Sequence, residues 1–557
     1  MTKTTNVHNS KVKASCLLLL ALNNLAIILV FSVYHVQGKP FKLKSLISRN
    51  ITAANDTNSD GCVQTDLDDY PIAAVDAFFA FASSTKYHHH HKSIEDGHYD
   101  EEEAIAESQL QIEIQTLSSQ LSIYLTSTQR KLSRLIRRGK AGENSSNDLI
   151  PQTWTIVRKK LEELGISYTT NWAKTNVVHT TVGNENGNLQ RSGGSGFGIV
   201  AEIGSGSSPC VLLFFDMCAD GTHTAMGLGA AAVLKQMESS LQGTVRLLFQ
   251  PSAEASVAGD NFETKKMVNE GALHMEPKVE AAYGVYVSHA LHSGSIGSRP
   301  GIILGSAKHF TVTISSVVVS WNDTAAVSQS AADPILASSS MVMSLQTIME
   351  PTSKFETFTK TGFVSVTRVV AGDNLEGSKP KTVTLVGILH ALDTETLILL
   401  QKQVKNIVVS LSKVHGCHST IEFTKEKYPP TMNDPALYSF SETIAATVSR
   451  NGRVVNVQPT VGAECFSFVA EKIPSTLFLL GQGSDEQDQS VIDGSSGNDN
   501  FMSIESKLFQ LNDNILVRGV ELHTTLALFT LKMLLSKAAA AIEDARIKEP
   551  RVYGGEC

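Results

Sequence analysis

The chain has 557 residues, of which 42% are hydrophobic, and a formal net charge of −8 at pH 7. This length and apolar content suffice to bury at least two cores, and the acidic balance argues against a nucleic acid as partner. The seven cysteines are scattered and too few for a disulfide framework, which argues against a disulfide-stabilised scaffold.

The amino terminus has the composition of a targeting segment. Three lysines within residues 3–13 precede an apolar run over residues 14–36. Residues 1–38 are therefore predicted to be a secretory signal peptide, with an uncleaved signal anchor as the alternative, because the run is long enough to span a bilayer. The sequons that agree with a secretory-pathway location (ER lumen, vacuole-like or extracellular) are at Asn50, Asn55, Asn144 and Asn322.

Residues 39–103 differ in composition from the rest of the chain. Asn, Asp, Ser and Thr dominate residues 50–69, and a histidine run at 88–91 is followed by acidic residues at 100–103. A histidine run can bind metal weakly, but this composition favours a disordered, solvated lead-in. Beyond it, the apolar spacing predicts one long helix over 104–138 and a second over 152–164 that Gly165 closes.

The next part of the chain, residues 104–304, alternates strands with helices. Buried-type strands are predicted at 198–203, 211–215, 244–249 and 281–287. This alternation predicts an α/β fold with a parallel-rich mixed sheet and helices on both faces.

From 305 to 427 the expected order changes to strand, helix, strand, strand, helix, strand. The predicted elements are 309–315, 334–349, 363–370, 382–389, 394–411 and 419–423. This is the βαββαβ order of a ferredoxin-like α+β unit. Residues 428–540 are then expected to return to the first domain, and 541–557 to form a tail.

Polar side chains follow two of the predicted strands at the points where they end. The strand at 211–215 runs into Asp216, Cys218, Asp220 and His223 before a helix over 224–236. The strand at 244–249 ends in Gln-Pro-Ser-Ala-Glu, residues 250–254. Because ligands bind outside the carboxyl ends of strands in open α/β sheets, both segments are predicted to line one site.

Several ordered segments resemble the aminoacylase and auxin-conjugate (IAA-amino acid) amidohydrolase family of dizinc peptidases. They include Cys-Ala-Asp-Gly-Thr-His-Thr-Ala-Met at 218–226, Gln-Pro-Ser-Ala-Glu at 250–254, Tyr-Pro-Pro-Thr-Met-Asn-Asp-Pro at 428–435 and Gly-Ala-Glu-Cys-Phe-Ser-Phe at 462–468. The resemblance spans roughly residues 150–540. It implies a zinc-peptidase-like catalytic domain, with 305–427 inserted as a lid that in many members forms the homodimer contact.

Carried over one by one, the family's site residues are only partly kept. The positions that the resemblance assigns to metal ligands hold Cys218, Asp220, Glu254 and Glu505, with Asp220 and Glu505 in place of histidines. Tyr286 stands where a further histidine ligand is expected, and Thr324 where a lid histidine is expected. Ala253 occupies the position of the general base, while His223 is retained.

The departures extend beyond single residues. Family members carry roughly two dozen residues between the counterparts of Asp216 and Cys218 that this chain lacks, which removes part of the pocket wall. His289 and His292 could substitute as ligands, although half-exposed loop histidines are the commoner explanation. Asp216, His223, Tyr286 and Thr324 are therefore expected to line a substrate pocket.

These exchanges predict a weakened catalyst. Four anionic ligands would neutralise two divalent ions, so that bound water becomes less acidic, and the missing base removes roughly 10²–10⁴-fold in rate. Three or four S/O ligands can still hold one ion, so we expect zinc or another divalent metal, as one ion or none. The predicted function is a metallo-amidohydrolase-like protein for N-acyl amino acids with weak or lost hydrolysis. An active hydrolase with rearranged ligands is the alternative.

Overall fold

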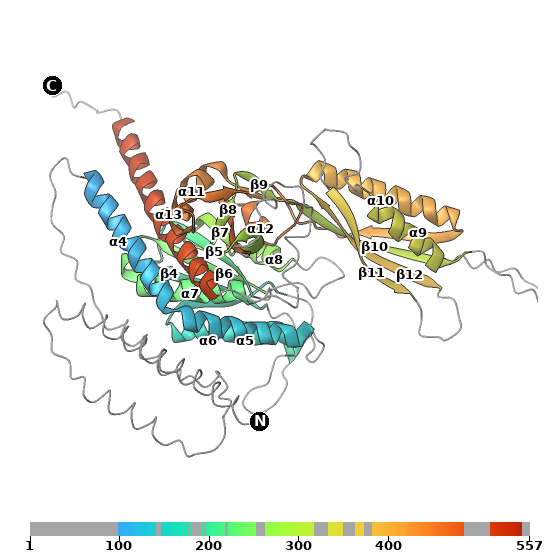
Figure 1. Cartoon of the computed structure of the whole chain (residues 1–557), viewed down its shortest axis with the longest axis horizontal. Helices are drawn as coiled ribbons and strands as arrows, with labels where there is room; N and C mark the ends of the chain where they lie inside the picture. Colours follow the sequence, from blue (N-terminus) through green and yellow to red (C-terminus); the bar gives the residue numbers. More distant parts are fainter. Residues whose placement is uncertain are drawn as a thin grey trace, which may run out of the picture. The chain divides into compact units, whose positions relative to one another are not determined.

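A computed structural model describes residues 99–140, 146–174, 179–180, 191–192, 196–217, 221–251, 262–316, 332–348, 362–371, 381–483 and 513–548 (Figure 1). All of them belong to one compact unit, Pro71–Cys557. The predicted signal segment, the lead-in up to residue 98 and the four sequons lie outside the described residues.

The main sheet is mixed and rich in parallel pairs, as predicted. Its order is β1-β4-β6-β5-β7-β16-β8-β15. Neighbours are parallel from β6 through β5 and β7 to β16, and again between β8 and β15; the other pairs are antiparallel. The strands are β1 (Ser167–Trp172), β4 (Gly198–Gly204), β5 (Cys210–Asp216), β6 (Thr244–Gln250), β7 (Val279–His292), β8 (Ile296–Ser298), β15 (Val454–Asn456) and β16 (Ser475–Gly483).

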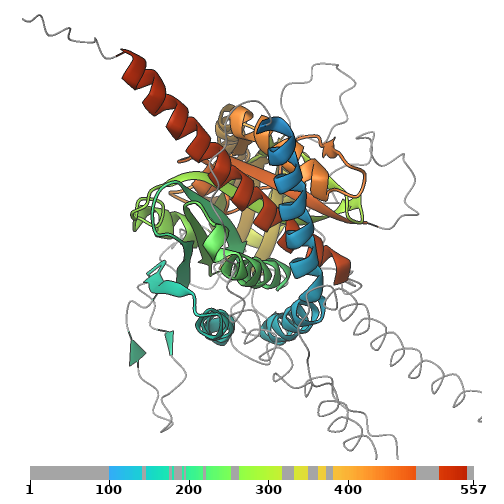
Figure 2. The ribbon, with the colours of Figure 1, turned by 90° about the vertical axis from the view of Figure 1, so that its left-hand side faces the viewer.

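Helices cover both faces of this sheet (Figures 1 and 2). Along β5, Val211, Leu213 and Phe215 enter one core, and the alternate residues Leu212 and Phe214 enter another, as the two-residue period of a strand requires. The first core contains α4 (Tyr99–Gln120), α5 (Ser122–Lys140), α6 (Ser146–Glu163), α7 (Thr222–Gln236), α11 (Pro435–Val448) and α13 (Asp513–Lys548). The second contains α8 (Glu263–Asn269) and α12 (Ser467–Ala470).

The prediction of one helix over 104–138 is wrong. The chain turns at Leu121, which separates α4 from α5, and the two helices run in different directions (Figures 1 and 2). Serines at 118 and 119 are weak helix formers, and both Leu121 and Leu125 are buried in the first core. The turn therefore lets both helices pack on the same core, whereas a single straight helix would extend away from it. Gly165 does close α6, with a φ of 65°.

The last helix, α13, is the one described helix long and apolar enough to span a membrane, over Asn514–Ile542. Its first half is packed into the first core through Ile515, Val520, Leu526 and Leu531. This burial accounts for the apolar residues of the first half, whereas only 33% of the most apolar 18-residue stretch is buried. The helix continues to Lys548, into the segment expected to be a tail.

A second sheet forms in residues 306–423, with the strand order β11-β12-β10-β13 and antiparallel neighbours throughout. The chain order of β10, α9, β11, β12, α10 and β13 is the predicted ferredoxin-like order. Asp333 and Asp393 cap the two helices by accepting hydrogen bonds from backbone amides of their first turns. The bounds are β10 (Ser306–Ser316), α9 (Pro334–Gln346), β11 (Gly362–Ala371), β12 (Thr382–Ala391), α10 (Thr394–Val414) and β13 (Cys417–Phe423).

Four short strands and one 3₁₀ helix complete the described elements. Strand β9 (Gly301–Leu304) pairs with β14 (Thr431–Asn433), and β2 (His179–Thr180) pairs with β3 (Arg191–Ser192). The 3₁₀ helix, Glu238–Ser240, follows α7.

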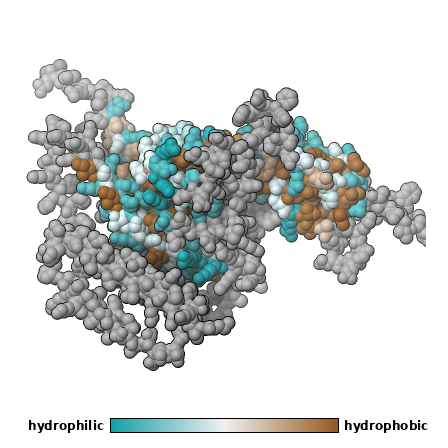
Figure 3. Space-filling view, in the orientation of Figure 1, coloured by the Kyte–Doolittle hydropathy of each residue, from teal (hydrophilic) through white to brown (hydrophobic). Residues whose placement is uncertain are grey.

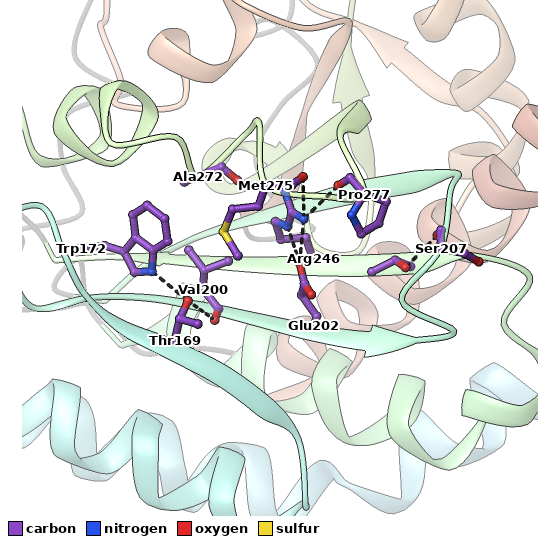
Figure 4. Close-up of polar contacts among 10 residues, drawn as sticks. Thr169, Trp172, Val200, Glu202, Ser207, Arg246, Ala272, Met275 and Pro277 are labelled. Atoms are coloured by element: carbon purple, nitrogen blue, oxygen red, sulfur yellow. Dashed lines mark hydrogen bonds and ion pairs between the residues drawn. The ribbon is translucent and has the colours of Figure 1, made fainter.

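A fully buried arginine on β6 fixes the segment that leads into β7 (Figure 4). Arg246 donates from Nε to Glu202 Oε1 at 2.8 Å, and its terminal nitrogens donate to the carbonyl oxygens of Ala272, Met275 and Pro277 at 2.9–3.2 Å. Glu202 also forms the ion pair that neutralises the guanidinium. This buried charge is thus fully compensated within the protein.

Candidate functional site

Three neighbouring parallel strands bring polar residues to one edge of the main sheet. Asp216, the last residue of β5, pairs in register with Gln250, the last residue of β6. On the other side of β5, Phe214 pairs with Gly284, which places Tyr286 two residues further along β7. The expectation that the ends of the strands at 211–215 and 244–249 meet at one carboxyl edge is therefore confirmed.

The Asp216 carboxylate is held by hydrogen bonds from neighbouring elements. Gln250 Nε2 donates to Asp216 Oδ2 at 2.8 Å, and Thr264 Oγ1 of α8 donates to Gln250 Oε1. Thr224 Oγ1, in the first turn of α7, donates to the Asp216 carbonyl oxygen at 3.0 Å. Asp216 is thereby oriented at the junction of the sheet with two helices.

The turn into α7 explains the glycine of the Asp-Gly-Thr-His segment. Gly221 has a φ of 82°, and a Cβ there would lie 2.6 Å from the Leu132 Cβ of α5. Only glycine meets both requirements without displacing the helix. The turn brings His223 into the buried region beside the sheet edge, where its side chain is 5% exposed.

His223 and Tyr286 contact each other at this edge. Their rings are T-shaped with centroids 4.6 Å apart, and both side chains are buried. Burial raises the pKa of Tyr286 well above its ordinary value, and the charges of Glu464 and Asp216 raise it further. Tyr286 is consequently a neutral phenol. Its Oη makes no well-formed hydrogen bond with the described residues, although the Phe466 backbone lies near enough to oppose the rise in pKa.

Two site residues in the segment at 462–468, Glu464 and Cys465, have no role in the sequence-based prediction. Burial is the main cause that raises the pKa of the Cys465 thiol, and the nearby charges of Asp216 and Glu464 add to it. Burial therefore keeps the thiol protonated at neutral pH, which makes it a poor nucleophile. The resemblance of this segment to the family motif is the signal that could have identified both residues.

A third residue that the sequence pattern does not reveal is Glu263, the first residue of α8. Its side chain is 8% exposed, and Oε2 has no hydrogen-bond partner among the described residues. Burial raises its pKa to about 7, while a hydrogen bond from its own backbone amide and the Lys266 charge oppose the rise, and the Asp216 charge adds to it. No sequence pattern marks this glutamate, because a helix N-terminus ordinarily exposes such a side chain.

Most of the predicted ligand positions lie outside the described residues. These are Cys218, Asp220, Ala253, Glu254, Thr324 and Glu505. Within the described ranges, no group of three or more His, Cys, Asp and Glu residues could hold a metal ion, and this includes His289 and His292 on β7. The donor chemistry of Tyr286 agrees, since a neutral phenol is a poor zinc ligand. The described part of the site does not fit a dizinc centre.

Comparisons with known proteins give a consistent answer. The model of peptidase family M20/M25/M40 matches residues 216–503. The chain is similar to two Arabidopsis thaliana proteins: IAA-amino acid hydrolase ILR1-like 2, with 30% identity over 70% of this chain and 83% of that protein, and ILR1-like 6, with 31% identity over 60% and 68%. A putative aminohydrolase from methicillin-resistant Staphylococcus aureus has a similar fold, with a TM-score of 0.52, 19% identity and coverage of 76% of this chain and 99% of that one.

Proposed function

This chain belongs to peptidase family M20/M25/M40, and from that membership we propose that it binds an N-acyl amino acid and hydrolyses its amide bond slowly or not at all. The names of the similar plant proteins support an IAA-amino acid conjugate as the ligand. The polar edge formed by Asp216, Gln250 and Tyr286 is the place where such a fold binds ligands.

The observation that carries the loss of turnover is the state of Tyr286. A buried, neutral phenol occupies the sheet edge where the family resemblance calls for an imidazole ligand. A hydrolytic metal centre polarises the scissile carbonyl and activates water, and it needs a base to accept the proton. In this chain Tyr286 offers no lone pair of comparable basicity, and Ala253 cannot accept a proton.

Metal binding is proposed at a reduced level. The family implies a divalent metal, with zinc as the first candidate, and Cys218, Asp220, Glu254 and Glu505 are the residues that would hold it. When bound, the ion would supply Lewis acidity to the carbonyl. The chain's own described groups contribute orientation instead: Gln250 and Thr264 hold the Asp216 carboxylate in place.

Hydrolysis of IAA-amino acid conjugates tests this proposal. Purified protein, with zinc or manganese added, is expected to bind a conjugate such as IAA-alanine in calorimetry but to release the amino acid slowly or not at all. Ala253→Glu alone should not restore turnover, whereas Ala253→Glu combined with Asp220→His, Tyr286→His, Thr324→His and Glu505→His should recover part of it. Robust turnover by the unmodified protein, abolished by a chelator and by Cys218→Ala, would establish the active hydrolase instead.

We also propose a homodimer through the second sheet. Apolar side chains are exposed on its helices and edge strand: Ile335, Leu336 and Met343 of α9, Ile398, Leu399 and Val409 of α10, and Val369 and Val370 of β11. Figure 3 shows this apolar surface where α9 and α10 lie. Such a patch favours a protein–protein contact. Light scattering on purified protein tests it, and a monomer at micromolar concentration would contradict it.

The secretory-pathway location stays a proposal that rests on the apolar run at 14–36 and the sequons at Asn50, Asn55, Asn144 and Asn322. Glycopeptide mass spectrometry tests it. Because Asn322 lies two residues before Thr324, a glycan there would emerge beside the position of the family's lid histidine. We therefore expect a chain glycosylated at Asn322 to be catalytically silent and monomeric.

A further inference from the structure

The carboxyl edge of the main sheet contains a buried carboxyl group whose partner is missing from the described protein. Glu263 is more than nine-tenths buried, yet its Oε2 accepts no hydrogen bond from any described residue. An unmet hydrogen-bonding group in a protein interior lowers stability, and more so when it is charged. A native side chain in this state calls for an explanation, and a bound ligand is one.

Charges of both signs act on Glu263. Asp216 acts on it from the end of β5, while Lys266, one turn further along α8, is the described cation that acts on it. Lys265 is engaged elsewhere, because its ammonium forms an ion pair with Glu426. Neither charged side chain provides a hydrogen bond to Glu263 Oε2, so a cationic donor from a ligand would satisfy this oxygen.

Aromatic rings adjoin this carboxyl group. Phe262, the residue before it, makes a T-shaped contact with Tyr428 at 4.6 Å between centroids and lies 5.2 Å from the ring of Phe468. Tyr428 is also close enough to Glu263 for its carboxylate to raise the pKa of the phenol. A carboxylate beside aromatic rings is a combination that suits an ammonium or guanidinium group, because ring faces attract cations.

We propose that Glu263 binds a positively charged group of the ligand, so that the site selects N-acyl amino acids that carry a primary ammonium or a guanidinium. This inference rests on the proposed function for the ligand class and adds the charge. The resemblance assigns no role to Glu263, and the cation would satisfy Oε2 with a charge-assisted hydrogen bond.

Three ligands of nearly equal size test the proposal by calorimetry at pH 8 on the full-length chain. Nα-acetyl-L-norleucine is neutral in its side chain, Nα-acetyl-L-lysine carries an ammonium there, and β-alanyl-L-norleucine carries one on the acyl side. One of the two cationic ligands should bind roughly 10-fold tighter or more than acetylnorleucine, as a charge-assisted hydrogen bond implies. Glu263→Gln should remove this gain, so that the cationic ligands bind no more tightly than acetylnorleucine.

A matched control separates the site from general charge effects. Glu280 is an exposed glutamate at the start of β7, and Glu280→Gln changes the net charge equally but should keep the gain. Equal binding of all three ligands, or a gain that persists in Glu263→Gln, would overturn the role of Glu263 while the proposed function stands. Failure of all three to bind would overturn both.

Discussion

Two buried charged side chains, one on the main sheet and one on a helix beside it, have completely different surroundings. Arg246 on β6 gives its donors to Glu202 and to three backbone carbonyls, all within the described protein (Figure 4). Glu263, beside the carboxyl edge, has an oxygen with no described partner and lies close to a second carboxylate, Asp216.

This difference distinguishes a buried charge that stabilises the fold from a buried charge that binds a ligand. A buried charge that the protein compensates itself holds elements together, and removing one partner leaves the others unsatisfied. A buried acid that it leaves uncompensated lowers stability and is retained where a ligand restores the balance. Arg246 is therefore expected to matter for stability, and Glu263 for binding.

Replacing Arg246 should produce the largest effect on stability. Arg246→Met keeps the length of the side chain but leaves Glu202 and the carbonyls of Ala272, Met275 and Pro277 without donors. We expect a loss of about 3–5 kcal/mol in the free energy of unfolding, measured by urea denaturation. The exposed Arg368 on β11 provides the control, since Arg368→Met should change it by less than about 0.5 kcal/mol. Equal losses would show that the buried cluster adds nothing specific.

Replacing Glu263 should have the opposite sign and depend on pH. Its pKa rises from 4.5 to about 7 on folding, so the protonated form is favoured in the folded state. Stability from this group is fully present below pH 4.5 and is lost as the pH rises through 7. At about 1.4 kcal/mol per pKa unit, Glu263→Gln should be more stable than wild type by up to about 3 kcal/mol at pH 8, with no such gain at pH 4.

Thermal unfolding of wild type and Glu263→Gln at pH 4, 6 and 8 measures how their difference in stability depends on pH. Glu280→Gln serves as the exposed control. A pH-independent difference between Glu263→Gln and wild type would contradict the raised pKa. Combined with the ligand series, the result also separates a stability effect of Glu263 from its effect on binding.

The sheet and its polar edge could be predicted from sequence because they depend on local patterns. The continuous apolar run that ends at Asp216 sets a buried parallel strand, and the spacing of strand and helix patterns between 306 and 423 predicts the second sheet. The turn at Leu121 could not be predicted in this way, since helical spacing continues through it and only packing against the core decides the bend.

The candidate site divides along the same line. Asp216 and Tyr286 follow from strand ends and from the resemblance, because each lies at a fixed point of a motif. Glu263 does not, because its burial depends on how α8 packs beside Phe468 and Tyr428, which lie far away in the sequence. Whether a buried charge has partners depends on tertiary packing, so local sequence patterns do not predict it.

The smallest expected effect concerns two tyrosines of β7 whose hydroxyl groups differ in hydrogen bonding. Tyr283 faces the first core and shares a 2.8 Å hydrogen bond with Thr530 of α13, whereas Tyr286 faces the second core with an Oη that makes no well-formed hydrogen bond with the described residues. Tyr283→Phe leaves the Thr530 hydroxyl without this partner and should cost about 1–2 kcal/mol in the free energy of unfolding. Tyr286→Phe removes a hydroxyl that makes no well-formed hydrogen bond with the described residues, so it should change stability by less than about 0.5 kcal/mol or raise it slightly. Both variants keep the ring and its packing, which makes each the control for the other in the same denaturation experiment.

A larger loss of stability for Tyr286→Phe than for Tyr283→Phe would mean that the Tyr286 hydroxyl has a hydrogen-bond partner in the folded protein. The interpretation of Tyr286 as a phenol without a hydrogen bond at the sheet edge would then be wrong.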